Sequence, residues 1–160
     1  STVWNRNHKI MPAGIGLLGN STSTQSAIIV PKPDDINIYF VFTVDWGGGS
    51  DGLNYYTVDM TLDGGLGDVI GLNGSPVKTL ILESPMSEKI TAVKVFDENA
   101  FWVISLKENR FYVYKVDENG VNITPIAGNS GFNLSEDPRG YLKTSPDGCL
   151  LYTSPSPRDS

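Results

Sequence analysis

The chain has 160 residues, enough for one domain at most. Its formal net charge of −6 argues against a nucleic-acid-binding protein, and its longest apolar run, Ile36–Val44, is too short to span a membrane as a helix. Charged residues make up only 19% of the sequence, while 17 residues are glycine and 10% are aromatic. This composition is typical of short strands joined by tight turns.

The N-terminal segment, residues 1–25, reads as the end of a strand followed by a glycine-rich loop. The stretch "GIGLLGN" fits G-x-G-x-x-G by count. Dinucleotide binding requires a strand before this motif and a helix after it. Here a turn containing proline precedes it and "STSTQS" follows. We therefore expect a loop that crosses between two sheets, with polar side chains from Asn20 to Gln25 hydrogen-bonded at one rim.

Four apolar, β-branched or aromatic runs follow, and no stretch keeps a helical period over three turns. They are "SAIIVPKP", "NIYFVFTVDW", "LNYYTVDMTL" and "VKTLIL". The same order recurs as "KITAVKVF", "FWVISL", "FYVYKV" and "VNITPI", separated by the turns "DENA", "KENR" and "DENG". Ala27–Val30 aligns with Ala92–Val95, and Ile38–Val44 aligns with Phe101–Lys107. "GYLKTSPDG", residues 140–148, begins a third copy.

A repeat of four short antiparallel strands with a period of about 50 residues predicts a β-propeller. The predicted fold is therefore all-β, a fragment of a propeller with about two four-stranded blades and the start of a third. Propeller blades bury their faces against one another, so the strand aromatics are assigned to blade packing. The expected partners in folding are the remaining blades of the same chain. The predicted partial propeller covers 1–148, with the end of a preceding blade and the crossing loop at 1–25, blades at 26–88 and 89–139, and the first strand of the next blade at 140–148.

The last twelve residues, "CLLYTSPSPRDS", change character after Gly148. They contain the only cysteine, Cys149, and show no recognisable strand or helix pattern. With one choice of codons, Cys149 to Asp159 resembles the transposase adapter of tagmentation sequencing libraries. This resemblance implies that 149–160 is a non-native, artefactual tail on a truncated reading frame. The start lacks an initiator Met and a signal segment, so we expect an internal fragment.

The N-terminal third also resembles a known family. "TVWNRNHKIMPAGIGLLGNSTSTQSAIIVPKP", followed by "IYFVFTVD" and "VDMTLDGGLGDV", is similar to a recurring segment of large secreted proteins of the Bacteroidota. These proteins carry a propeller-like N-terminal region and often end in PKD-type modules and a gliding-motility-associated, type IX secretion C-terminal sorting domain. The resemblance covers nearly all of residues 2–148. It implies an extracellular or outer-cell-surface location and no established catalytic residue.

The sequence contains few groups suited to catalysis. His8 is the only histidine, and no cluster of histidine or cysteine accompanies it as a metal site or base partner. We interpret it as a loop histidine with local hydrogen bonds. "STSTQS" lacks the G-x-S-x-G elbow of a serine nucleophile. No catalytic residue is therefore assigned.

A weak calcium hypothesis concerns "DMTLDGGLGDV". It places Asp59, Asp63 and Asp68 close to three glycines, and carboxylates on a flexible loop are suitable ligands for Ca²⁺. The spacing is not that of an EF-hand loop. A hairpin turn with left-handed glycines explains the segment equally and is the preferred interpretation. No other metal or cofactor is expected.

The enlarged loop "DWGGGSDGLN", residues 45–54, is the candidate binding site. Large loops on a rigid scaffold are where binding residues concentrate. Trp46 is suited to stacking on a sugar ring or a peptide, and packing against a neighbouring blade is an equal alternative. The candidate ligand-binding residues are Trp46, Asp45, Asp51 and Asn54.

Two classes of function follow, and a third possibility is that the fragment has none. The first is a non-catalytic propeller module that binds an extracellular glycan or protein, in adhesion or as a scaffold. The alternative is a propeller hydrolase or lactonase whose channel residues lie mostly in missing blades. Asp, Glu, Asn or His side chains from the innermost strands of several blades, converging on the axis, would favour the enzyme.

Overall fold

The computed structural model describes residues 1–71, 80–131 and 139–154, and the protein is all-β throughout them. Fourteen strands form four antiparallel sheets in these residues, with one 3₁₀ turn, η1 (Asp63–Gly65). Within the same part of the chain, no helix is long and apolar enough to cross a membrane.

The first large sheet is built from β3 (Ala27–Pro31), β4 (Ile38–Val44) and β5 (Leu53–Asp59), each antiparallel to the next. Two short strands share the far edge of β5. These are β6 (Asp68–Ile70), beside the end of β5, and β7 (Leu80–Glu83), beside its start. The predicted fourth strand, "VKTLIL", lies partly outside the described residues, and its last three residues belong to β7. The short strand β6 was not predicted.

The second large sheet repeats this layout. It runs from β8 (Ile90–Lys94) through β9 (Phe101–Lys107) to β10 (Arg110–Asp117). The edge of β10 is again shared, by β11 (Gly120–Val121) and β12 (Ile126–Asn129).

The split of the last strand corrects the expectation of one continuous strand through "VNITPI". The Asn122 side chain accepts a hydrogen bond from the Thr124 amide at 3.0 Å, which closes a local turn. Pro125 follows it and has no N–H to donate to a ladder. The backbone therefore leaves the sheet between β11 and β12.

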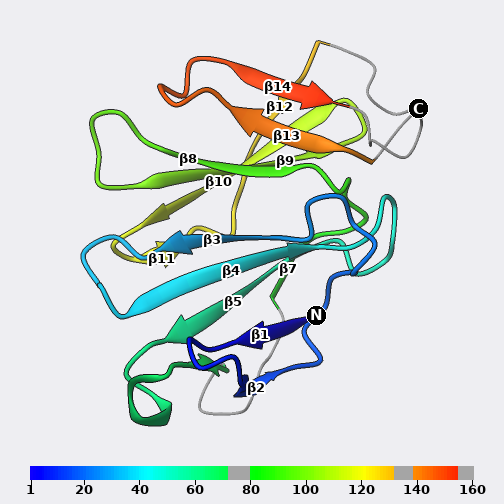
Figure 1. The fold of residues 1–160 in the computed structure, drawn as a ribbon. Helices are drawn as coiled ribbons and strands as arrows, with labels where there is room; N and C mark the ends of the chain where they lie inside the picture. Colours follow the sequence, from blue (N-terminus) through cyan, green and yellow to red (C-terminus); the bar gives the residue numbers. More distant parts are fainter. Residues whose placement is uncertain (72–79, 132–138, 155–160) are drawn as a thin grey trace.

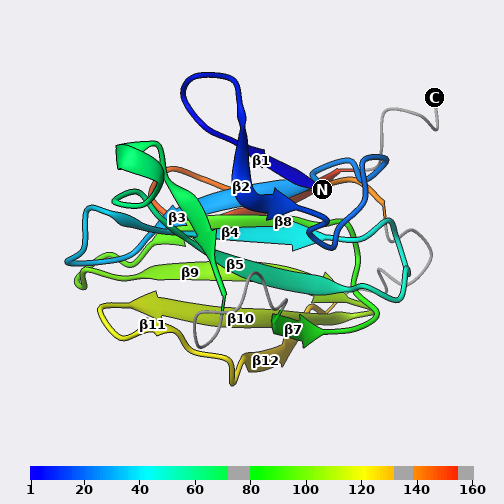
Figure 2. The ribbon, with the colours of Figure 1, turned by 90° about the horizontal axis from the view of Figure 1, so that it is seen from below.

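The sheets stack face to face. The hairpin of β1 (Thr2–Trp4) and β2 (Ile10–Ile15) lies at one end of the stack in Figure 1, and the hairpin of β13 (Tyr141–Thr144) and β14 (Leu151–Ser154) lies at the other. The first strands β3, β8 and β13 are neighbours in space. Figure 2 shows later strands of both large sheets progressively farther from the side of β3 and β8.

The core has two parts, one on each face of the first large sheet. Phe42, Leu53 and Val30 join Val103 and Tyr114 of the second sheet in the larger cluster. The smaller cluster lies against the β1–β2 hairpin and contains Met11, Leu17, Val41, Tyr56, Val58 and Val69. Both faces of β4 are therefore buried, which explains why its sequence is apolar without alternation.

The C-terminal tail contains a strand, contrary to the expectation of no regular structure from Cys149 onward. β14 pairs with β13 in register, with Leu151 opposite Thr144. The turn "SPDG" accounts for this pairing. Gly148 has φ +72° and its N–H donates to the Ser145 carbonyl at 2.9 Å. Such a turn directs β-competent residues such as Leu151 and Tyr152 back along the preceding strand.

Candidate functional site

The candidate loop joins β4 to β5, and it presents Trp46 to solvent with 54% of the residue exposed. The loop is held from within by Asp45, which is buried. One Asp45 carboxylate oxygen accepts from the Trp46 amide at 2.8 Å, and the other accepts from the Asp51 amide at 3.1 Å. The carboxylate therefore closes the loop between its two ends.

Gly49 is required by the same closure. A Cβ atom at this position would lie 2.0 Å from Oδ2 of Asp45 and 2.9 Å from Nε1 of Trp46. Only glycine leaves room for the buried carboxylate and for the indole beside it.

Asn54 supports the loop from below. Its side chain is fully buried and donates to the carbonyl of Asp51 at 2.8 Å and to that of Gly52 at 3.4 Å. Two of the four candidate binding residues, Asp45 and Asn54, are thus occupied in shaping the loop. Trp46 and the half-buried carboxylate of Asp51 remain available to a ligand, since that carboxylate has no partner among the described residues.

Glu88 is the residue that the sequence did not identify. It lies just before β8, is only 3% exposed, and accepts from the Gly47 amide at 3.0 Å and from the Thr24 amide at 2.6 Å. One carboxylate thereby fixes the Trp46 loop and the loop before β3 to the second sheet. Its partners are backbone amides 41 and 64 residues away, so no local pattern marks it.

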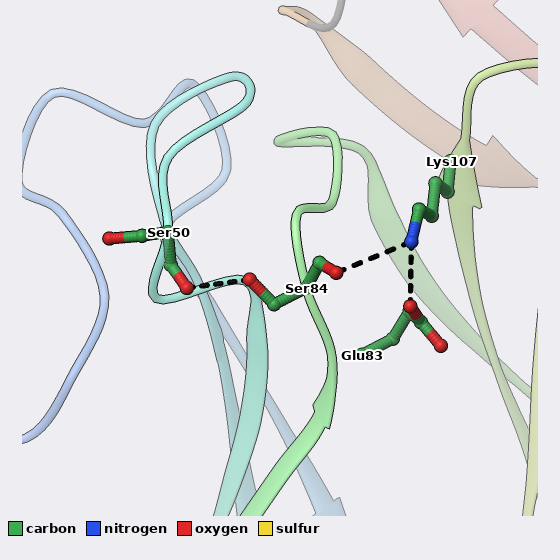
Figure 3. Close-up of polar contacts among 4 residues, drawn as sticks. All are labelled: Ser50, Glu83, Ser84 and Lys107. Carbon is green, nitrogen blue, oxygen red and sulfur yellow. Dashed lines mark hydrogen bonds and ion pairs between the residues drawn. The ribbon is translucent and has the colours of Figure 1, made fainter.

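A second set of contacts fastens the tip of the loop, as Figure 3 shows. The Ser84 hydroxyl donates to the Ser50 carbonyl at 2.6 Å. Lys107 donates to Glu83 at 2.7 Å and to the Ser84 carbonyl at 3.3 Å. The hydrogen bond to Glu83 raises the pKa of Lys107. The loop is therefore held to both large sheets.

Two of the three aspartates of the calcium hypothesis, Asp59 and Asp68, have separate structural partners. Asp59 accepts from the amide and the hydroxyl of Thr61, at 2.8 and 2.7 Å. Asp68 accepts from the amides of Ala13 and Val69, both at 2.8 Å. Asp63 lies in η1. Residues 1–71, 80–131 and 139–154 contain no group of three His, Cys, Asp or Glu placed to hold a metal ion.

His8 lies in the exposed turn between β1 and β2, with φ +56°. Its amide donates to the Asn5 carbonyl at 3.0 Å, and the Asn5 side chain accepts from the amides of Asn7 and Lys9 at 3.0 and 3.2 Å. These contacts define a hairpin turn.

Comparisons with protein-family models, with curated proteins and with solved structures gave no match to this chain. Its function is therefore inferred from its own residues and their geometry.

Proposed function

We propose that this chain is part of a non-catalytic, β-propeller-like binding module of a secreted or cell-surface bacterial protein. Two features support the propeller-like arrangement. Both large sheets have the same strand layout, and their first strands lie together with β13 on one side of the stack. Radial stacking of such sheets places first strands around a common axis. The location outside the cell rests on the resemblance to secreted Bacteroidota proteins.

The observation that supports the binding function is an exposed tryptophan on a loop whose backbone is hydrogen-bonded to buried carboxylates. Trp46 stands beside the buried carboxylates of Asp45 and Glu88, which hold the backbone on both sides of it. A ligand that stacks on the indole binds a loop that folding has already ordered, so binding loses little further conformational entropy. An extracellular glycan or a protein segment is the ligand class that suits an exposed aromatic ring beside the Asp51 carboxylate.

A fluorescence titration with a panel of soluble oligosaccharides tests this proposal. The Trp46→Ala variant should lose the emission change that the wild-type protein shows. Trp4→Ala is the matched control, because Trp4 is 59% exposed but lies on the β1–β2 hairpin. An equal response from wild type and Trp46→Ala would reject Trp46 as the contact residue.

The alternative, a propeller hydrolase or lactonase, has no supporting observation in the described parts of the chain. The same titration separates the two functions. Steady consumption of an added oligosaccharide or lactone, proportional to protein concentration, would favour the enzyme over the binding module.

A further inference from the structure

A hollow of about 380 Å³ lies where the first strands β3, β8 and β13 meet, and Trp46 does not line it. Its volume is at the lower end of the range for small-molecule sites, about 300–1,000 Å³. Each strand contributes to its lining: Ile28 and Ile29 from β3, Thr91 and Ala92 from β8, and Lys143 and Thr144 from β13. Gln25 adds an amide from the loop before β3.

The polar side chains of this hollow have no side-chain partners in the part of the chain that the structure describes. Gln25, Thr91, Lys143 and Thr144 form no side-chain hydrogen bond or ion pair with any described residue. Thr91 is only 7% exposed as a residue, but its hydroxyl is not one of the buried, unpaired polar atoms of the described residues and lines the hollow as an accessible group. The four polar side chains are therefore available to a ligand in the hollow.

The charge of the lining selects the kind of ligand. Lys143 is its only charged residue, in a chain whose net charge is −6. One ammonium among neutral hydroxyl and amide groups matches a single carboxylate, because a dianion would leave one charge uncompensated.

The apolar part of the lining further restricts the class of ligand that fits the hollow. Ile28, Ile29 and Ala92 form an apolar wall, and 66% of Ile29 is exposed. A sugar ring offers an apolar face to such a wall and hydroxyls to Gln25, Thr91 and Thr144. We propose that the hollow binds a carboxylate-bearing sugar of the uronic acid class, with Lys143 pairing the carboxylate. This site goes beyond the proposed function, because Trp46 takes no part in it.

Isothermal titration calorimetry with methyl glucuronide tests the site, with methyl glucoside and acetate as comparison ligands. The glucuronide should bind at least fivefold more tightly than either. Lys143→Ala should weaken its binding about five- to tenfold, whereas Lys143→Arg, which keeps the charge, should lose less. Lys9→Ala, an exposed lysine in the β1–β2 turn, is the matched control and should change nothing.

Three results would overturn the proposal: glucuronide binding unaffected by Lys143→Ala, glucoside binding as tight as glucuronide, or acetate binding as tight as glucuronide. Thr91→Val gives an independent measurement, since it removes a neutral donor and should weaken binding severalfold. Trp4→Ala, on the β1–β2 hairpin, should leave the glucuronide affinity unchanged.

Discussion

The Trp46 loop and the hollow between β3, β8 and β13 use polar side chains in opposite ways. In the loop, Asp45 and Asn54 are buried and hydrogen-bonded to backbone groups, and Glu88 holds the loop from outside in the same manner. In the hollow, Thr91 and Lys143 have no partner within the described residues. Asp45, Glu88 and the side-chain nitrogen of Asn54 shape the loop, although Oδ1 of Asn54 and the Asp51 carboxylate have no partner among the described residues. In the hollow, all the polar side chains remain available.

The contrast shows that a carboxylate in a conspicuous loop is weak evidence of a ligand site. Asp45 stands beside an exposed tryptophan in the sequence, yet both of its oxygens are taken by the loop's own amides. Thr91 has no distinguishing sequence context, yet its hydroxyl lines the hollow and has no partner among the described residues. Whether the group is already satisfied separates the two cases, and only the fold shows that.

Removing the buried carboxylate of Glu88 should give the largest change. Glu88→Ala deletes two charge-assisted hydrogen bonds and leaves the Gly47 and Thr24 amides unpaired, so the free energy of unfolding should fall by about 3 kcal/mol. Urea denaturation followed by circular dichroism measures this loss. Glu118→Ala, at an exposed turn, should stay within about 0.5 kcal/mol of wild type. A loss below about 1 kcal/mol for Glu88→Ala would contradict its role.

Gly49→Ala should come next, because it forces a Cβ against the Asp45 carboxylate. Overpacking of this kind costs about 2 kcal/mol, and Trp46 should move with the loop. Thermal unfolding and the Trp46 emission maximum report the two effects. Gly128→Ala is the matched control, since a Cβ there meets nothing within 4 Å. Equal stability of the two variants would show that the loop adapts more freely than its contacts indicate.

Much of the fold could be predicted from the sequence. The aligned segments Ile38–Val44 and Phe101–Lys107 are β4 and β9 with the same bounds, because long apolar runs and the turns beside them define a strand locally. The short strands could not be predicted. β11 has two residues, too few to show a period, and β14 depends on the "SPDG" turn before it.

The candidate site was predicted only in part. The sequence points to Trp46 because an aromatic residue among glycines in a long loop is unusual; the structure shows it exposed, and its role in binding stays a prediction. Glu88 and Thr91 were missed, since one meets amides from distant segments and the other meets none. Such roles depend on which strands become neighbours, and composition and spacing do not contain that information.

Tyr114 is a third case, a polar group in the core whose hydroxyl has no partner among the described residues. It is fully buried. Tyr114→Phe should therefore raise the free energy of unfolding by about 1 kcal/mol at pH 7. Chemical denaturation measures this gain, and a loss of about 1 kcal/mol would show that the hydroxyl is paired in solution.

The same variant predicts a pH effect with a definite sign. Burial, reinforced by the nearby Glu83 carboxylate, raises the pKa of Tyr114 well above its usual value of about 10. The folded protein keeps this proton while the unfolded chain loses it, so wild-type stability falls as pH rises above about 10. Tyr114→Phe lacks this contribution. Its advantage over wild type should therefore be larger at pH 10.5 than at pH 7.

The smallest effect on stability should come from the hollow itself. Thr91→Val keeps the side-chain shape and removes a hydroxyl that has no partner among the described residues, so the free energy of unfolding should rise by about 0.5 kcal/mol. Thr61→Val is the opposite case, because that hydroxyl donates to Asp59 at 2.7 Å, and it should lower stability by about 0.5 kcal/mol. Paired urea denaturation curves measure both. If both variants change the free energy of unfolding in the same direction, hydrogen-bond pairing does not separate structural hydroxyls from available ones. If the changes have opposite signs and Thr91→Val also binds glucuronide more weakly, the protein is less stable at this position than it could be because the hydroxyl is kept free for a ligand.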